Sequence, residues 1–366
     1  MRIGMAATDV GPSNMFKMVV PVLEKGDHQV IIAPAIKRWP SDLVDELLTA
    51  DVVATGYGSI KSDQEVFLIG CLHGGGVTHV LVEDVPDGVV GRVSERAPAL
   101  ISGVDSLVVA LPTSIRKAKE LGFTDVVAIT PPHWGPSYQA MVDQTASRDG
   151  LMVELAGKKR TLEDHEPLIV VWGTKELALE LEMLRQAIAA ATKFFGREGF
   201  VVGHHAHPAL LKQFEVNQAI DLPGAGEIFA HVPRLITEGL TITRALRVAD
   251  VRICSGGPME SIVCAFARLP VIYYAGSYQG GTVIDRNRYQ GLPDGQWFVP
   301  ALGGALVADE DDFLDILESS RDAGVLASLL ATQEKNFPVP ENWDTASILA
   351  DHLVSVAWRF KVIAPS

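Results

Sequence analysis

The clearest chemical signal in this sequence of 366 residues is the turn Ser255-Gly256-Gly257, which separates a short apolar strand at 251–254 from a helix. Backbone N–H groups in the first turn of a helix have no partner inside it, and glycines let an anion approach them. Glu260 stands one turn into the helix, where its carboxylate can accept hydrogen bonds from ribose hydroxyls. These residues suit a diphosphate with a sugar at each end. Close packing of an ordinary strand-to-helix turn is the alternative explanation of the glycines.

Three histidines follow another predicted strand, in the segment His204-His205-Ala-His207-Pro208. Neighbouring residues of a strand point to opposite faces, so His204 and His205 are poorly placed to share a metal ion. No acidic or cysteine ligand accompanies them, and we therefore predict no metal site, with zinc as the less favoured alternative. An imidazole can instead donate a hydrogen bond to a ligand phosphate or to a leaving-group oxygen. We expect His204 to be structural.

Carboxylates gather in two loops of the first half. Glu83 and Asp84 follow a predicted strand at 78–82, and either can act as general base toward an acceptor hydroxyl or as a proton shuttle on a sugar ring. A polar turn is the alternative, and the order Pro-Asp-Gly favours it for Asp87. Asp9, in the first loop, is either a catalytic residue or a turn or helix-cap residue. That loop lacks the Gly-x-Gly-x-x-Gly spacing of a dinucleotide site, which disfavours a nicotinamide cofactor.

A glycine-rich segment at 276–282 precedes two cations, Arg286 and Arg288. Such segments often close over a ligand. A surface loop with solvated arginines is the equally weighted alternative.

Short apolar runs alternate with helical segments, which predicts parallel sheets covered by helices on both faces. In the first half we expect a helix capped by Ser13 or Asn14, together with the strands at 2–7, 29–33, 51–54, 78–82, 106–110 and 125–129. A polar stretch at 157–167 is interpreted as a linker. The alternation then resumes with a strand at 168–172 and a long helix at 175–195. We therefore predict an α/β protein with two Rossmann-like domains, at 1–160 and 161–343.

The composition describes a globular protein with ample core, since 48% of its residues are hydrophobic and 21% charged. A net charge of −14 argues against nucleic acid or an anionic membrane as partner. No apolar run has membrane-spanning length, and the N-terminus does not read as a signal sequence. The three cysteines have no metal-binding spacing and are interpreted as buried thiols. A cytoplasmic enzyme fits these features.

The pattern from Ala249 to Tyr274 resembles the C-terminal domain of GT-B-fold enzymes that handle nucleotide-activated sugars. That superfamily includes UDP-N-acetylglucosamine 2-epimerase and glycosyltransferases with a His-Pro motif, which His207-Pro208 resembles. The resemblance implies two domains facing a central cleft, and a last helix at 344–366 that crosses back onto the first. The positions that it implies for ligand binding are the diphosphate site Ser255, Gly256 and Gly257, the ribose ligand Glu260, the first-loop glycine Gly11, and the phosphate-facing His207, with His205 as its competitor.

The leading hypothesis is a metal-independent glycosyltransferase that uses a nucleotide-sugar donor, such as a UDP-sugar, and no cofactor. His207, His205, Asp9 and Asp84 are its candidate catalytic residues. A nucleotide-sugar 2-epimerase or hydrolase on the same fold is the second hypothesis, and a non-catalytic nucleotide-binding or scaffold protein is the third. The acceptor is not specified by these motifs, and a homodimer is left open.

Overall fold

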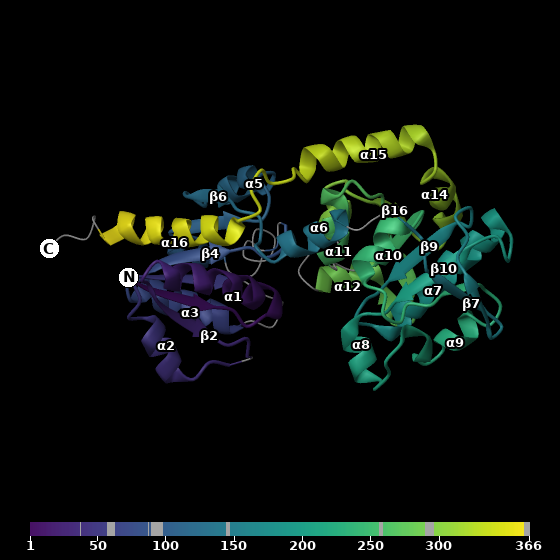
Figure 1. The fold of residues 1–366 in the computed structure, drawn as a ribbon. Helices are drawn as coiled ribbons and strands as arrows, with labels where there is room; N and C mark the ends of the chain where they lie inside the picture. Colours follow the sequence, from purple (N-terminus) through teal and green to yellow (C-terminus); the bar gives the residue numbers. More distant parts are fainter. Residues whose placement is uncertain are drawn as a thin grey trace. The chain divides into compact units, whose positions relative to one another are not determined.

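The computed structural model describes residues 1–36, 38–56, 63–86, 88, 98–143, 147–255, 259–289 and 296–361 (Figure 1). The chain divides into two compact units. The first contains Met1–Gly135 and the chain from Pro340 onward, and the second contains Pro136–Tyr289 and the chain up to Val339. No helix among the described residues is long and apolar enough to cross a membrane.

The first unit is built on a six-stranded parallel sheet in the order β2-β1-β3-β4-β5-β6. Its strands are β1 (Arg2–Ala6), β2 (Gln29–Ala33), β3 (Val52–Gly56), β4 (Thr78–Val82), β5 (Ser106–Val109) and β6 (Val126–Ala128). Its helices are α1 (Val10–Lys25), α2 (Ser41–Leu47), α3 (Asp63–Gly74), η1 (Pro98–Gly103), α5 (Ser114–Glu120) and α16 (Thr345–Lys361), while α6 (Trp134–Val142) leads into the second unit. The central strand β3 is buried along its whole length, as a sheet covered on both faces requires.

The last helix, α16, belongs to the first unit. It lies along α1 (Figure 1), and its Leu349, Leu353 and Val356 are buried in one core with residues of α1 and of the central strands. Polar contacts add to this packing at the N-terminal ends of β5 and β6. Nε2 of His352 lies 3.0 Å from Oγ of Ser106, and Arg359 donates to Asp125 at 2.8 Å. The first unit therefore needs residues from both ends of the sequence.

The second unit is built on an eight-stranded sheet in the order β16-β13-β12-β9-β10-β11-β7-β8. Six strands are parallel, and β7 and β8 form an antiparallel edge. The strands are β7 (Met152–Leu155), β8 (Lys158–Thr161), β9 (Leu168–Trp172), β10 (Val201–His205), β11 (Arg234–Leu235), β12 (Val251–Cys254), β13 (Ile272–Tyr274) and β16 (Leu306–Ala308), with a separate hairpin of β14 (Ser277–Tyr278) and β15 (Gly281–Thr282). The helices are α7 (Leu177–Phe195), α8 (Pro208–Gln213), η2 (Ala219–Asp221), α9 (Ala225–Ile228), α10 (Ile242–Val248), α11 (Met259–Phe266), α12 (Val283–Tyr289), α13 (Phe298–Ala301), α14 (Phe313–Ser319) and α15 (Ala323–Asn336).

Two expectations about local structure differ from what is observed. The stretch at 157–167 is not a linker, because residues 158–161 form β8 and the chain enters the second unit earlier, after Gly135. Ala156 and Gly157 both have positive φ and turn the chain between β7 and β8, so the charged residues that follow belong to an exposed edge strand. In the first unit, α1 begins at Val10 with Asp9 as its cap, rather than after Ser13 or Asn14.

Candidate functional site

The carboxyl ends of three neighbouring strands lie in register in the second unit. Trp172 of β9 pairs with His205 of β10 on one side and with Cys254 of β12 on the other. Neighbouring strands are ~4.8 Å apart, so the ends of β10 and β12 are separated by about 10 Å. The segments that follow these three strands therefore emerge at one edge of the sheet, where open α/β sheets bind their ligands. This edge, formed by residues 173–176, 205–208 and 255, is called the phosphate edge below.

Ser255 follows β12 at this edge and is fully buried. Its Oγ has no hydrogen-bond partner among the residues that the structure describes. Gly256 and Gly257 lie outside the described residues. Glu260 lies in the first turn of α11, and burial raises the pKa of its carboxyl group. A buried hydroxyl at the carboxyl end of a parallel strand suits a ligand oxygen that accepts a hydrogen bond.

His205 closes β10 at the phosphate edge. Its Nε2 is buried and has no hydrogen-bond partner within the described parts of the chain. Burial, together with a smaller effect of the neighbouring His204, lowers the pKa of His205 to about 4. The imidazole is therefore neutral at pH 7, so it can donate from one nitrogen and accept at the other.

His207 caps helix α8. Its Nδ1 accepts a hydrogen bond from the backbone N–H of Ala209 at 3.0 Å. Burial lowers the pKa of His207, and the positive charge of Lys175 acts in the same direction, while Glu180 raises it. A neutral ring that accepts at Nδ1 carries its proton on Nε2. The cap thus fixes a tautomer in which Nε2–H is a donor, which is the form needed to bind a phosphate oxygen.

Beneath the edge lies the buried carboxylate of Glu180, on α7. It accepts hydrogen bonds from the backbone N–H of Thr174 at 2.6 Å and faces Nε2 of His204 at 2.7 Å. Gly173 is required here, because a Cβ at this position would overlap the carboxylate and lie 2.7 Å from the backbone N of His207. Glu180 therefore joins the segment that follows β9 to the strand β10. His204 is held by this pair through Nε2, whereas its Nδ1 is buried with no hydrogen-bond partner among the described residues, so the structural role expected for it stays a prediction.

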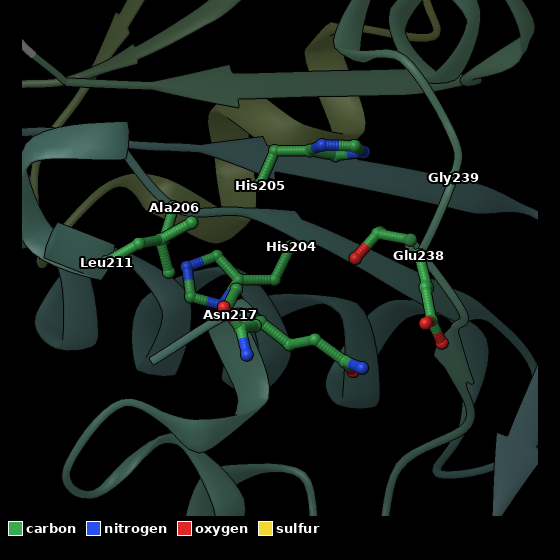
Figure 2. A pocket seen from close by; sticks show the side chains of 10 residues that line it. His204, His205, Ala206, Leu211, Asn217, Glu238 and Gly239 are labelled. Carbon is green, nitrogen blue, oxygen red and sulfur yellow. The ribbon is translucent and has the colours of Figure 1, made fainter. Parts of the chain in front are cut away.

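A cavity of about 240 Å³ opens next to His205 (Figure 2). Figure 2 shows the imidazoles of His204 and His205 at its wall, together with Asn217 and Glu238. The lining also contains Gln218 and Thr237 but neither lysine nor arginine. Side-chain amides, a hydroxyl and a carboxylate can pair with both donors and acceptors, so this lining suits an uncharged, hydroxyl-bearing group rather than a phosphate.

The first unit carries carboxylates at the carboxyl edge of its own sheet. Glu65, on α3, is fully buried and accepts a hydrogen bond from the backbone N–H of Thr8 at 2.7 Å and another from the Thr8 hydroxyl. Glu83 is buried after β4 and accepts from the backbone N–H of Ala110 at 3.1 Å. Asp84 is half-buried beside it. Asp87 lies outside the described residues.

Asp9 and Gly11 have local roles in α1. Oδ1 of Asp9 accepts from the backbone N–H of Val10 at 2.7 Å, which is the helix-cap role weighed above. Gly11 is in the first helical turn, and an added Cβ there would overlap Oδ2 of Asp84. The carboxylate of Asp84 therefore packs closely against the first turn of α1. The phosphate-binding role expected for Gly11 stays a prediction.

Within the described residues, no group of three or more histidine, cysteine, aspartate or glutamate side chains is arranged to hold a metal ion.

Sequence reasoning missed Glu180 and Glu65. Both stand on apolar helix faces, Glu180 in line with Leu184 and Ala187, and Glu65 in line with Ile69 and Leu72. A lone carboxylate at helical spacing among buried apolar residues was the available signal.

No protein-family model and no curated protein sequence matches this chain. Solved structures are similar along nearly its whole length. UDP-GlcNAc 2-epimerase from Neisseria meningitidis, solved with UDP-GlcNAc, aligns with a TM-score of 0.58 at 10% identity, covering 97% of this chain and 100% of that one. MurG from Acinetobacter baumannii aligns at 0.56 and 12% identity, covering 97% and 99%. The calicheamicin glycosyltransferase CalG4 aligns at 0.54 and 12% identity, covering 100% and 99%. The chain thus has the GT-B fold, with two Rossmann-like domains.

Proposed function

We propose that this protein is a glycosyltransferase that takes its sugar from a nucleotide-activated donor. The observation that carries the proposal is the phosphate edge, where the register of β10, β9 and β12 brings His205, Thr174 and Ser255 to one side of the sheet. The diphosphate is assigned to Ser255, Gly256 and Gly257, ahead of α11. The cavity beside His205 is assigned to an uncharged part of the same ligand.

In the transfer, the bond between the anomeric carbon of the sugar and the diphosphate oxygen breaks, and an acceptor oxygen bonds to that carbon. Negative charge builds on the departing diphosphate. Neutral imidazoles stabilise this charge by donating hydrogen bonds. In His207 the hydrogen bond that Nδ1 accepts from Ala209 already places the proton on Nε2, which can then donate. The acceptor proton passes to a general base, and Asp84 is our assignment for that role. The proposal includes no metal ion.

A second candidate function is a nucleotide-sugar epimerase or hydrolase. The observation that favours it is the presence of Glu65, Glu83 and Asp84 together at the carboxyl edge of the first sheet, since proton transfer on a sugar ring needs several carboxylates. The epimerase among the similar structures shows that the fold accommodates such chemistry.

Two measurements distinguish these functions. Calorimetry with UDP, CDP, GDP and ADP tests nucleotide binding, and the absence of binding to all four contradicts both enzyme proposals in favour of a non-catalytic protein. Incubation with UDP-N-acetylglucosamine alone then tests the activity. A transferase leaves the donor almost unchanged without acceptor, whereas an epimerase forms a new sugar and a hydrolase releases UDP. Gly256→Val, which blocks the backbone approach, should abolish binding of the nucleotide in a folded protein.

A further inference from the structure

An ion pair joins the segments that follow β9 and β13, the two strands that flank β12. Nε of Arg286, on α12, lies 2.5 Å from Oε1 of Glu176, which follows β9. The neighbouring residue Asn287 donates to the hydroxyl of Tyr273 at 3.1 Å, and Tyr273 pairs in register with Cys254. The pair therefore connects a helix anchored beside β13 to a segment that follows β9. Because β12 is the strand between β9 and β13, this ion pair links segments from the two sides of the strand that Ser255 follows.

The guanidinium of Arg286 is only partly used by this contact. Its side chain is 12% exposed, and its Nη1 is buried with no hydrogen-bond partner in the part of the chain that the structure describes. A buried donor without a partner is costly, and a buried positive charge more so. An oxygen of an anionic ligand is the partner that would satisfy both the donor and the charge.

Glu176 holds the guanidinium in a defined orientation. Besides the contact to Nε of Arg286, it forms a hydrogen bond with the side chain of Tyr278, in the β14–β15 hairpin. Fixing Nε leaves the opposite side of the planar guanidinium group available, because its donors point in set directions. Glu176 thus acts on the ligand only through Arg286 and is a positioning residue.

We propose that Arg286 binds the diphosphate of the nucleotide ligand through its Nη1, with Glu176 as the residue that orients it. The proposal rests on the proposed function for its choice of ligand. It adds a guanidinium to the positive charge of Lys175 at the same edge, where burial favours the neutral forms of His205 and His207. From its sequence, the segment with Arg286 is expected to close over a ligand. The proposal gives this segment a more specific role, because Arg286 itself binds the phosphate.

Calorimetry with UDP, inorganic pyrophosphate and uridine tests the proposal on the full chain. Arg286→Gln should weaken UDP and pyrophosphate binding by about tenfold to a hundredfold, the scale of one or two charge-assisted hydrogen bonds, and leave uridine binding unchanged. Arg286→Lys keeps the charge but not the planar donor set, so its loss should be smaller. Glu176→Gln should also give a smaller loss, confined to the two phosphate ligands.

Arg288→Gln is the matched control. Arg288 lies on the same helix, its side chain is 58% exposed, and its ion pair with Asp285 at 3.5 Å lies on the surface. This variant should bind all three ligands like the wild type. Equal UDP affinity in the wild type and in folded Arg286→Gln and Arg286→Lys variants overturns the assignment of Arg286 but leaves the proposed function standing. If the wild type binds pyrophosphate but no nucleotide, the proposed function fails while pyrophosphate still tests Arg286. If it binds none of these anions, both proposals fail.

Discussion

Nε2 of His204 faces Oε1 of Glu180 at 2.7 Å, in a pair that is almost completely buried. Removing one member of a buried polar pair leaves the other without its hydrogen-bond partner, which costs about 1–3 kcal/mol. We expect Glu180→Ala to lower the free energy of unfolding by this amount in denaturant titrations. Glu180→Gln, which keeps an acceptor for Thr174, should lose clearly less.

The control for this pair is Glu182→Ala on the same helix. Glu182 forms a contact with Arg185 at the surface, so its removal should cost less than about 1 kcal/mol. Similar unfolding midpoints for Glu180→Ala and Glu182→Ala would show that the buried pair does not stabilise the second unit.

His207→Ala should reduce turnover more than it weakens binding of the donor. If Nε2–H of His207 donates to the departing diphosphate, its loss should lower kcat by about 10²–10³-fold, the scale for one such donor. His207→Gln retains a donor and should keep more activity. The measurement is steady-state kinetics with the donor that binding experiments identify. Normal turnover in His207→Ala with a large loss in His205→Ala would assign the role to His205.

Asp84→Asn should slow transfer while leaving nucleotide affinity unchanged. The amide is similar in size and fits against Gly11, but it cannot accept the acceptor proton, so a loss of about 10²–10⁴-fold in rate is expected. The rate of product formation and the Kd for the nucleotide should be measured on the same preparation. An unaltered transfer rate would remove Asp84 from the mechanism.

Stability should fall in mild acid, in part because of His79 in the first unit. This fully buried imidazole lies between Oγ1 of Thr55, at 2.7 Å, and the carbonyl of Gly103, at 3.2 Å. Burial lowers the pKa of His79 to about 4. Between pH 6.5 and 4 the unfolded chain binds a proton that the folded protein does not, so the stability contributed by the neutral form is present above pH 6.5 and is lost as the pH falls.

The size of this effect should be visible in a variant without the imidazole. Going from pH 6.5 to 5, His79 alone should cost about 1.5 kcal/mol, and His79→Gln should show a correspondingly shallower loss in denaturant titrations of the first unit. Carboxylates titrate in both proteins, so the difference between them isolates the histidine. Parallel pH profiles would contradict a neutral buried His79.

The strands of the sheets were predictable because apolar runs of strand length have clear limits. Gln29–Ala33, Leu168–Trp172 and Val251–Cys254 begin and end where the sequence places them. The charged hairpin strand Lys158–Thr161 was mistaken for a linker, since an exposed edge strand has no apolar pattern to reveal it.

The site was only partly predictable, because its contacts depend on tertiary structure. The strand-end positions of His205, His207 and Ser255 follow from local pattern, and a parallel sheet brings such ends together. That Arg286 reaches Glu176 across β12 depends on the order of strands in the sheet, which residue types do not encode locally. The burial of Glu180 depends in the same way on the packing of α7.

The division of the first unit between the two ends of the chain affects its biosynthesis. A growing chain that has reached Val339 contains every residue of the second unit, whereas the first unit still lacks Leu349, Leu353 and Val356 of its core. Because domains fold as units during translation, the second unit should mature first, and the first should stay exposed to chaperones and proteases until α16 has been synthesised. A stop codon placed between Val339 and α16 should therefore destabilise the first unit, most of which is synthesised before the second.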